Sequence, residues 1–378
     1  MIKRTFWLER IEKAWGKRSV IWLAGVRRAG KTVLCQSLSD IEYFDCEKPR
    51  TRDRLADPEA FLDSLGSRRI VLDEIHRLDN PSQLLKIAAD HYPRLHVLAT
   101  GSSTLASSTK FKDTLTGRKT NLWLTPMNHR DLKDFGGGLD DRLLKGGLPP
   151  FYLSPQVSET EFQEWMDDYW AKDIQELFRL ERRASFLKFA QLLFLQSGGI
   201  FEASAFARLC EISRPTIMNY LTVLEETFVA HVVRPFSSHK AAEIVAAPKV
   251  YGFDTGFVSY FRGWESLRPE DKGPLWEHVV LNEIHSLTQG GEEIRYWRDK
   301  QDHEIDFIWN RRGRPPVAIE CKWSSRNAGA ENLRLFRKHY PGGENWIIAA
   351  DIRTPYQRRL GDTLVEMMGL EHLPQKIV

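Results

Sequence analysis

The 378-residue sequence is poor in cysteine and contains no long apolar run. Its four cysteines, Cys35, Cys46, Cys210 and Cys321, lie far apart, and none belongs to a C-x-x-C pair. This spacing argues against a zinc site or a disulfide framework. No stretch approaches the 18 or so apolar residues that a membrane-spanning helix needs. We therefore expect a chain without a membrane partner in a reducing cytoplasm.

The sequence also lacks a strong net charge. Its 54 Lys and Arg against 51 Asp and Glu leave a net charge of +3. This charge is too small to prove a polyanionic partner, although it is compatible with a local basic patch. A chain of this length is too long for one compact core and predicts two or three domains. Residues 1–15 have the pattern of an amphipathic helix rather than a signal peptide.

A Gly-rich segment, Gly25-Val26-Arg27-Arg28-Ala29-Gly30-Lys31-Thr32, has the spacing G-x-x-x-x-G-K-T. Residues 19–24 predict a buried strand before it, and residues 32–38 predict the start of a helix after it. This order places a phosphate at a helix N-terminus, within reach of Lys31, and lets Thr32 offer its hydroxyl to Mg²⁺. A surface turn is the alternative. We predict ATP contacts from Gly25, Arg27, Arg28, Ala29, Gly30, Lys31, Thr32 and Val33.

Two further apolar strands end in polar residues. Residues 68–74 run into Asp73 and Glu74, so Asp73 would hold Mg²⁺ together with Thr32, and Glu74 would polarise the attacking water. The alternative is a strand end followed by a helix cap. Residues 95–100 form the second strand, after which Ser102 would sense the γ-phosphate or position the lytic water. An ordinary turn suits Ser102 equally well.

Arg118 immediately precedes an apolar-alternating strand at residues 119–124. At this position it is a candidate arginine finger, which would complete the ATP site of a neighbouring subunit. A solvated surface charge is the alternative. The order of one strand and helix followed by more apolar strands predicts an α/β fold with a parallel sheet.

Several motifs together resemble a prokaryotic family of AAA+-type P-loop ATPases with a conserved C-terminal region of unknown function. They read Gly-Val-Arg-Arg-Ala-Gly-Lys-Thr, Leu-Asp-Glu-Ile, Thr-Gly-Ser-Ser, Leu-Thr-Gly-Arg, Leu-Thr-Pro-Met-Asn-His-Arg-Asp-Leu and Gly-Gly-Leu-Pro. The resemblance covers nearly the whole chain. It implies an ATPase that uses ATP and Mg²⁺ and forms a homo-oligomer, such as a hexameric ring, with Arg118 acting in trans. It also implies a helical lid, in which Arg142 is a guess for a second sensor arginine.

The middle of the chain predicts a winged helix-turn-helix. Residues 186–196 and 203–210 have helical periodicity, a third helix begins after the N-cap Ser213, and residues 228–234 read as a strand. The outward face of the third helix would contact DNA through Arg214, Thr216 and Asn219. The same shape also serves as a structural lid or as a protein-interaction module.

The last 140 residues predict a helix at 275–287, strands at 294–298, 304–309 and 317–323, a helix at 328–339 and a strand at 346–349. Period-two alternation puts Glu320 and Lys322 on one face, near Asp306 on the adjacent strand. With Glu277 on the first helix, this set resembles the PD-(D/E)xK nuclease superfamily. The resemblance implies that Asp306 and Glu320, helped by Glu277, bind one or two Mg²⁺ ions and that Lys322 orients the attacking water.

The C-terminal pattern has alternative interpretations. By itself the spacing D-x13-E-x-K is typical of surface salt bridges, and a domain that keeps the nuclease fold can grip DNA without cutting it. Asp254, in the segment Phe-Asp-Thr-Gly, is interpreted as a structural helix cap.

We therefore predict an AAA+ ATPase core at residues 1–130, a helical lid or linker at 131–184, a winged helix-turn-helix at 185–240 and a PD-(D/E)xK nuclease-like domain at 241–378. The predicted function is ATP-dependent processing of DNA, by translocation or remodelling of branched or forked DNA, with Mg²⁺-dependent cleavage as an optional second activity. The alternatives are a nucleotide-dependent switch in a defence or regulatory system and a DNA-binding ATPase with an inactive nuclease fold.

Overall fold

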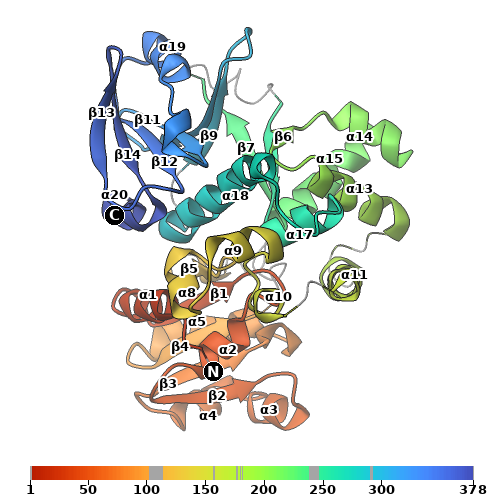
Figure 1. The fold of residues 1–378 in the computed structure, drawn as a ribbon. Helices are drawn as coiled ribbons and strands as arrows, with labels where there is room; N and C mark the ends of the chain where they lie inside the picture. Colours follow the sequence, from red (N-terminus) through yellow and green to blue (C-terminus); the bar gives the residue numbers. More distant parts are fainter. Residues whose placement is uncertain are drawn as a thin grey trace.

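The computed structural model describes residues 2–101, 114–155, 158–175, 178, 180, 182–237, 247–289 and 293–377. Two β-sheets organise these residues (Figure 1). The first lies in the N-terminal part of the chain and the second in the C-terminal part, with short helices between them.

The first sheet has five strands in the order β2-β3-β4-β1-β5, and every neighbouring pair is parallel. The central strands are buried on both faces, which explains why their sequences are continuous apolar runs. The expected α/β fold with a parallel sheet is confirmed. The strands are β1 (Val20–Ala24), β2 (Ile41–Asp45), β3 (Arg69–Asp73), β4 (His96–Thr100) and β5 (Lys119–Trp123).

Helices cover this sheet. The first, α1, has apolar residues at helical spacing and buries Phe6, Trp7, Ile11, Ala14 and Trp15, so the expected amphipathic helix is present. The helices up to β4 are α1 (Thr5–Trp15), α2 (Lys31–Gln36), α3 (Pro49–Arg54), α4 (Pro58–Asp63), the 3₁₀ turn η1 (Ile75–Arg77) and α5 (Pro81–His91).

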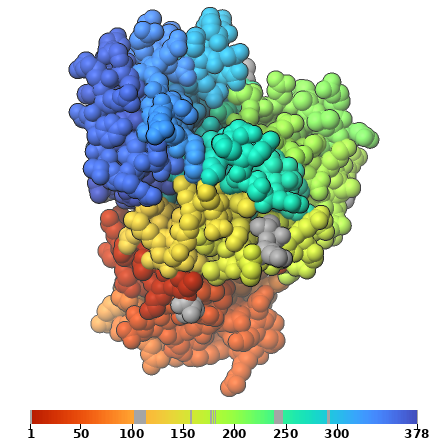
Figure 2. Space-filling view, in the orientation of Figure 1, coloured from red at the N-terminus to blue at the C-terminus, as the bar shows by residue number. Residues whose placement is uncertain are grey.

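Short helices follow β5 and form the yellow band across the middle of the molecule (Figure 2). They are α8 (His129–Asp134), α9 (Leu139–Lys145), α10 (Pro149–Leu153), α11 (Glu159–Asp168) and the π-helix η2 (Tyr169–Gln175). A capping box starts α8, because Asn128 accepts a hydrogen bond from Asp131 N and the Asp131 carboxylate accepts one from Asn128 N.

The next six elements follow the order helix, strand, helix, helix, strand, strand. Ser213 caps the third helix by accepting a hydrogen bond from Thr216 N, as its sequence position predicts. The elements are α13 (Arg183–Leu195), β6 (Gly199–Ile200), α14 (Ala203–Cys210), α15 (Arg214–Glu226), β7 (Ala230–Pro235) and β8 (Lys249–Gly252).

The C-terminal elements contain the expected α-β-β-β-α-β order, from α18 to β12. They are α17 (Thr255–Phe261), α18 (Pro269–Thr288), β9 (Glu293–Arg298), β10 (Glu304–Asn310), β11 (Val317–Lys322), η3 (Ser325–Asn327), α19 (Glu331–His339), β12 (Asn345–Ala349), β13 (Tyr356–Leu360), β14 (Thr363–Met368), η4 (Leu370–His372) and α20 (Leu373–Lys376). The helix α18 begins six residues before the expected start at 275, because Pro269 is tolerated in its first turn and Pro274 lies early enough to remain in the helix.

The second sheet has nine strands in the order β13-β14-β12-β11-β10-β9-β7-β8-β6. β7 pairs with β8 in antiparallel register and with β9 in parallel register. The sheet therefore crosses the expected boundary at 240/241, because the ladder partner of β7 comes from residues 249–252. The sequence does not indicate that the sheet is continuous. Tertiary packing decides that β7 pairs with β9, which is about 60 positions further along the chain.

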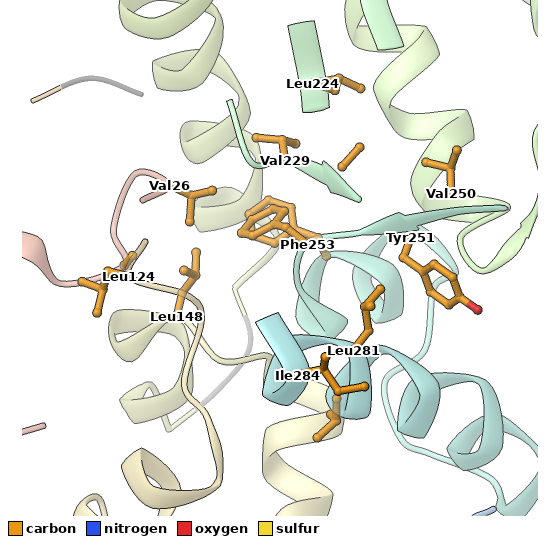
Figure 3. Close-up of a cluster of buried hydrophobic side chains, with 14 of the residues drawn as sticks. Val26, Leu124, Leu148, Leu224, Val229, Val250, Tyr251, Phe253, Leu281 and Ile284 are labelled. Carbon is orange, nitrogen blue, oxygen red and sulfur yellow. The ribbon is translucent and has the colours of Figure 1, made fainter. Parts of the chain in front are cut away.

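One buried apolar cluster joins the two sheets. Figure 3 shows Val26, in the Gly-rich segment, with Leu148, Phe253 and Leu281 in the same cluster. Burial of such side chains stabilises the contact by about 1.5–3 kcal/mol each. In the part of the chain that the structure describes, no helix is long and apolar enough to cross a membrane.

Candidate functional site

The Gly-rich segment forms the loop between β1 and α2. Gly30 has a left-handed backbone with φ of 94° and occupies the N-cap of α2. Gly25 has φ of 154°, and a Cβ there would lie 2.6 Å from the backbone oxygen of Leu124. Both glycines are therefore required by the backbone path of this loop.

Lys31 points back into the loop. Its Nζ donates to the backbone oxygen of Gly25 at 2.8 Å and to that of Val26 at 3.3 Å. Burial lowers the pKa of the Lys31 ammonium, while the nearby carboxylates of Glu74 and Asp173 oppose this shift. The ammonium is therefore held where the loop turns around it.

Asp73 is the centre of a set of hydroxyl groups at the end of β3. Its Oδ2 accepts hydrogen bonds from Thr32 Oγ1 at 2.8 Å and from Tyr43 OH at 2.5 Å, and its Oδ1 accepts one from Thr100 Oγ1. The structure thus brings the two expected metal residues, Thr32 and Asp73, into direct contact. Tyr43 and Thr100 were not expected; their signal is that β2 and β4 end at the same edge of the sheet.

Glu74 has a left-handed backbone with φ of 55°, a conformation that non-glycine residues rarely adopt. Its N–H donates to Thr100 Oγ1 at 3.1 Å, and its Oε2 lies 3.1 Å from His76 Nδ1. Burial raises the pKa of Glu74, but the His76 contact and the charge of Lys31 outweigh it and leave the pKa below its usual value. Glu74 is therefore held ionised beside the loop. Ser102 lies outside the described residues.

The helices α10, α11 and η2 contact the loop at its two arginines. Arg27 Nε lies 3.1 Å from Asp173 Oδ2, and the indole of Trp165 donates to the backbone oxygen of Arg27 at 3.1 Å. The Arg28 guanidinium lies over the ring of Phe151, 5.8 Å from its centroid. Asp173 is buried on the π-helix η2, 146 positions from Arg27, so sequence spacing gave no sign of it.

Arg118 lies away from this loop. It precedes β5, whose Lys119 pairs with Val20 at the start of β1. Arg118 therefore lies at the N-terminal ends of the strands, whereas Gly25 follows the C-terminal end of β1. Its Nε lies 2.7 Å from Asp90 Oδ1 on the protein surface. Within one chain, Arg118 therefore does not join the other expected ATP-site residues.

Arg142 is buried and serves a structural contact. Its Nε donates to the backbone oxygen of Met127 at 3.0 Å, and its Nη1 donates to Thr255 Oγ1 at 2.9 Å. These bonds fix α9 against the start of α17. The guanidinium is buried among these partners, and none of these contacts supports the guess of a sensor arginine.

Asp254 caps α17, as expected. Its Oδ1 accepts from Gly256 N at 2.9 Å, and its Oδ2 accepts from Gly147 N at 2.6 Å. A Cβ on Gly146 would lie only 1.9 Å from Asp254 Oδ1. The two glycines of the Gly-Gly-Leu-Pro motif therefore allow the segment after α9 to approach this carboxylate closely.

The three expected DNA-contact residues lie at the start of α15. Arg214 and Asn219 are exposed, whereas Thr216 is half-buried and its hydroxyl lies 2.8 Å from Ser213 Oγ. Arg214 and Asn219 are thus available to a ligand, while the Thr216 hydroxyl is engaged in the helix cap.

A second polar site lies on the nine-stranded sheet. Lys322 Nζ donates to Glu320 Oε2 at 2.6 Å, and Asp306 Oδ2 accepts from Cys321 N at 2.7 Å. These bonds place Asp306 beside the Glu320–Lys322 pair, on neighbouring strands β10 and β11. Glu277 approaches from α18, close enough for the charge of Asp306 to raise its pKa.

The ionisation of this site is shifted by burial and by mutual repulsion. Burial raises the pKa of Glu277 to about 8 and that of Glu320 to about 7, and the charge of Asp306 adds to both shifts. Burial also raises the pKa of Asp306, although the ammonium groups of Lys322 and Lys249 oppose the change. The buried carboxylates therefore attract protons or other cations.

Three residues of this site escaped the sequence analysis. Lys249, at the start of β8, lies 2.6 Å from Glu304 Oε1 and 3.9 Å from Glu277 Oε2. The hydroxyl of Tyr251 donates to Glu277 Oε2 at 3.0 Å. Lys249 and Tyr251 could not be found from sequence, because only the fold of the sheet brings β8 to α18 and β10.

Asp306 and Glu320 are the residues of this site that could hold a magnesium ion. Among the described residues, no three His, Cys, Asp or Glu side chains converge on one point. Mg²⁺ usually takes only one or two carboxylates and keeps several waters. Glu320 Oε1 is buried without a hydrogen-bond partner of normal geometry, although Asn332 approaches its carboxylate. Asp306 and Glu320 are thus the pair that suits Mg²⁺.

Known protein families match three consecutive parts of the chain. Residues 17–133 match the model of an AAA domain. Residues 137–268 match a domain of unknown function (DUF8612), and residues 272–366 match another (DUF4143). The N-terminal part, with its loop and parallel sheet, is therefore a P-loop ATPase domain of the AAA type, a class of domain that binds nucleotides.

Similar whole chains carry no assigned activity. The uncharacterized protein Rv2008c of Mycobacterium tuberculosis is 27% identical over 349 residues, which span 88% of this chain and 77% of that protein. The uncharacterized protein MJ1544 of Methanocaldococcus jannaschii is 20% identical over 319 residues, 75% of this chain and 70% of that protein.

Solved structures resemble the chain only weakly. A STAND protein with a tetratricopeptide repeat sensor from Pyrococcus horikoshii is 12% identical and aligns over 74% of this chain but 44% of its own length, with a TM-score of 0.28. The clamp loader delta protein of Bacillus subtilis is 12% identical over 73% of this chain and 99% of its own, with a TM-score of 0.27. Scores this low carry no argument about function.

Proposed function

We propose that the chain is an ATP-dependent DNA-processing protein. Its AAA-type domain hydrolyses ATP, and the energy drives translocation on, or remodelling of, branched or forked DNA held by the rest of the chain. The C-terminal site adds Mg²⁺-dependent cleavage. The observation that carries the proposal is α18, whose middle holds Glu277 at the C-terminal site and whose C-terminal end contacts the ATPase domain.

The ATP site uses the residues around the loop. Backbone N–H groups from Gly25 to Val33 and the ammonium of Lys31 bind the phosphates. Thr32 and Asp73, already in contact, hold Mg²⁺. Glu74 polarises the attacking water, and its lowered pKa keeps the carboxylate ionised for this role. Arg27 and Arg28 connect the occupied loop to the lid.

A homo-oligomer completes the ATP site. Arg118 precedes Lys119, which pairs with Val20, so it lies at the opposite end of β1 from Gly25, about 20 Å of strand away. Its role as an arginine finger therefore requires a neighbouring subunit, for example in a hexameric ring. In that assembly Arg118 exchanges its surface partner Asp90 for the γ-phosphate of the neighbour.

Residues 183–252 form a winged helix-turn-helix in this proposal. The order of α13, β6, α14, α15, β7 and β8 supports it, with β8 pairing antiparallel to both β6 and β7. The exposed Arg214 and Asn219 at the start of α15 contact DNA. Arg214 neutralises backbone phosphate, and Asn219 has both donor and acceptor groups for base edges.

The C-terminal domain is proposed to have a PD-(D/E)xK nuclease-like fold. Asp306 and Glu320 hold Mg²⁺, which when bound offsets charge on the scissile phosphate and acidifies a water. Lys322 orients that water through its position beside Glu320, and Glu277 accepts a proton in the same site. Tyr251 fixes Glu277 through the hydrogen bond from its hydroxyl.

The helix α18 joins the two sites physically. Its Asn282 Nδ2 donates to the backbone oxygens of Pro126 and Met127, and its Glu283 Oε2 accepts from His129 N at 2.8 Å. Just beyond its end, Gln289 bonds both the N–H and the oxygen of Trp123 on β5. Glu277 lies 12 residues before Gln289, about 18 Å along the helix, so α18 can transmit a shift of β5 to Glu277.

The segment after β5 is also tied to the phosphate loop. Arg4 Nη1 donates to the backbone oxygen of Ala29 at 2.9 Å, and its Nη2 donates to that of Thr125 at 3.1 Å. The same guanidinium forms a buried ion pair with Asp131. Loop, segment and α18 are therefore connected by hydrogen bonds over their whole length.

A labelled four-way DNA junction tests the proposal. It is incubated with the full-length protein, Mg²⁺ and ATP, and each sample runs on a native and a denaturing gel. We expect separated strands on the native gel that are lost in Lys31→Ala, and shortened strands on the denaturing gel that are lost in Asp306→Ala. Separation without shortening would leave a remodelling ATPase with an inactive nuclease fold. No change in either gel would contradict the proposal and favour a nucleotide-dependent switch.

A further inference from the structure

We propose that Lys249 is a built-in cation of the C-terminal carboxylate site, so that the site takes one divalent metal ion instead of two. This inference rests on the metal-binding role proposed above for Asp306 and Glu320. It concerns the side of the site at Glu277 and Glu304. The motif residues Asp306, Glu320 and Lys322 do not determine whether a second metal ion binds there.

The position of Lys249 supports a fixed charge. The residue is 5% exposed, and its Nζ lies 2.6 Å from Glu304 Oε1 and 3.9 Å from Glu277 Oε2. It also lies 5.6 Å from the centroid of the Tyr251 ring. A buried ammonium is stable only when carboxylates pair with it, so these contacts hold the charge at one place.

The charges of the site balance with a single divalent ion. Four carboxylates, those of Glu277, Glu304, Asp306 and Glu320, carry four negative charges when ionised. For Glu277 and Glu320, whose pKa values are raised to about 8 and about 7, this state is reached at higher pH or when a bound cation displaces the proton. Two ammonium groups, those of Lys249 and Lys322, supply two positive charges. The remaining two negative charges equal the charge of one Mg²⁺, so a second ion would leave the buried site positive.

The two lysines divide the site into two sides. Lys322 is bonded to Glu320 Oε2, which leaves the buried Glu320 Oε1 with no hydrogen-bond partner of normal geometry. On the other side, Lys249 holds the carboxylates of Glu304 and Glu277. A metal therefore has an open oxygen at the Asp306–Glu320 side, whereas at the Glu277 side it would meet an ammonium less than 4 Å from that carboxylate.

Lys249 comes from a different part of the chain than the motif residues. Its strand β8 pairs with β7, with Lys249 opposite Val233, and β7 joins the C-terminal strands through β9. The continuous sheet is what delivers this lysine to the site. The Asp-Glu-Lys motif alone would leave the Glu277 side to a second ion.

Metal binding without nucleotide tests the inference, with Mn²⁺ as the probe. Free Mn²⁺ is measured by electron paramagnetic resonance during titration of the full-length protein, and Asp306→Ala identifies the ions that belong to this site. For the natural chain we expect one Asp306-dependent ion. Lys249→Met removes the internal charge, so we expect a second Asp306-dependent ion, or about tenfold or tighter binding of the first.

Three variants serve as controls. Lys249→Arg keeps the charge and retains one ion, whereas Lys249→Gln removes the charge, keeps a hydrogen-bond donor for Glu304 and behaves like Lys249→Met. Lys249→Gln carries the test if Lys249→Met does not fold by circular dichroism. Lys338→Met, at an exposed lysine on α19, leaves Mn²⁺ binding unchanged.

The outcomes separate this inference from the proposed function. Two Asp306-dependent ions in the natural chain, or unchanged stoichiometry and affinity in both uncharged variants, would overturn the role of Lys249 while the metal site stands. Absence of any Asp306-dependent ion in the natural chain and in the variants would overturn the metal site itself, and the inference with it.

Discussion

The two acidic sites of the molecule differ in the partners of their carboxylates, which are hydroxyl groups at one site and ammonium groups at the other. At the end of β3, Asp73 is surrounded by the hydroxyls of Thr32, Tyr43 and Thr100, which are neutral and leave its charge intact. On the nine-stranded sheet, the carboxylates lie beside the ammonium groups of Lys249 and Lys322. The first arrangement suits a metal that arrives with a nucleotide, because nothing but the nucleotide complex has to offset the charge.

The second arrangement is largely neutralised before any ligand binds. Its lysines hold the carboxylates together in the folded chain, and the charge that remains suits one divalent ion. The difference teaches that acidic residues near a sheet edge are not sufficient to define a metal site. The partners of the carboxylates decide how many cations the site can accept.

The largest expected effect separates the two sites completely. Lys31→Ala removes the ammonium that the loop holds for the phosphates, so ATP hydrolysis should fall by at least about 100-fold. Mn²⁺ binding at Asp306 should not change. Phosphate release and the Mn²⁺ titration measure the two quantities. The exposed Lys17→Ala is the matched control and should hydrolyse ATP normally.

Arg118→Ala tests whether the ATP site, unlike the C-terminal site, is shared between subunits. A finger supplied in trans contributes about 10³-fold or more to the rate, so hydrolysis should fall by that order. Mixing Arg118→Ala with Lys31→Ala should restore part of the rate, because one variant keeps the loop and the other keeps the arginine. Failure of the mixture to recover would mean that Arg118 only pairs with Asp90.

Arg4→Met probes the packing on which both sites depend. The change leaves the Asp131 carboxylate buried without its ion-pair partner, and such a loss costs about 3–5 kcal/mol. We expect a lower melting temperature together with weaker ATP binding, since Arg4 also bonds Ala29. Thermal melts monitored by circular dichroism measure the first effect. A melt identical to that of the natural chain would contradict the role assigned to this pair.

The smallest expected effect concerns pH and the junction at α18. Burial raises the pKa of Glu283 from about 4.5 to about 8. The folded state therefore holds the Glu283 proton more tightly than the unfolded state does. The contribution of Glu283 to the free energy of unfolding is complete below about pH 4.5 and is lost as the pH rises through about 8. Glu283→Gln removes this dependence, so the fall in melting temperature from acid to alkaline pH should shrink by roughly 2–4 °C.

The melting temperature of Glu283→Gln should still depend on pH, because other buried groups titrate as well. Glu277 and Glu320 also have raised pKa values, so part of the fall in melting temperature remains. The side-chain amide oxygen that Glu283→Gln introduces can still accept the bond from His129 N, which keeps the junction intact. An unchanged slope in Glu283→Gln would contradict the burial of an ionisable group at this junction.

Local motifs made the ATP site predictable from sequence. The loop residues are contiguous, and the strand ends at Asp73 and Glu74 follow from apolar runs, so spacing alone places them near one another. Tyr43 and Asp173 were missed because a phenol on a neighbouring strand and a carboxylate on a π-helix have no local pattern. The order of strands in the sheet brings Tyr43 to Asp73, and the packing of η2 against the loop brings Asp173 to Arg27.

The C-terminal site was predictable only in part. Alternation along β11 correctly put Glu320 beside Lys322, because neighbours two apart on a strand share a face. Lys249 was out of reach, since its contact with Glu304 depends on the pairing of β7 with β9, far apart in the chain. For the same reason the domain boundary at 240/241 cut through a sheet that the structure shows to be continuous.

The central claim, that ATP hydrolysis by the AAA-type domain serves work on DNA, is tested most directly by one rate measurement. Phosphate release from ATP is followed for the full-length protein with and without a saturating four-way DNA junction. We predict that the junction raises the rate several-fold and that Arg214→Ala with Asn219→Ala reduces this stimulation without changing the basal rate. An identical rate with and without DNA would contradict the claim and leave a nucleotide-dependent switch as the better description.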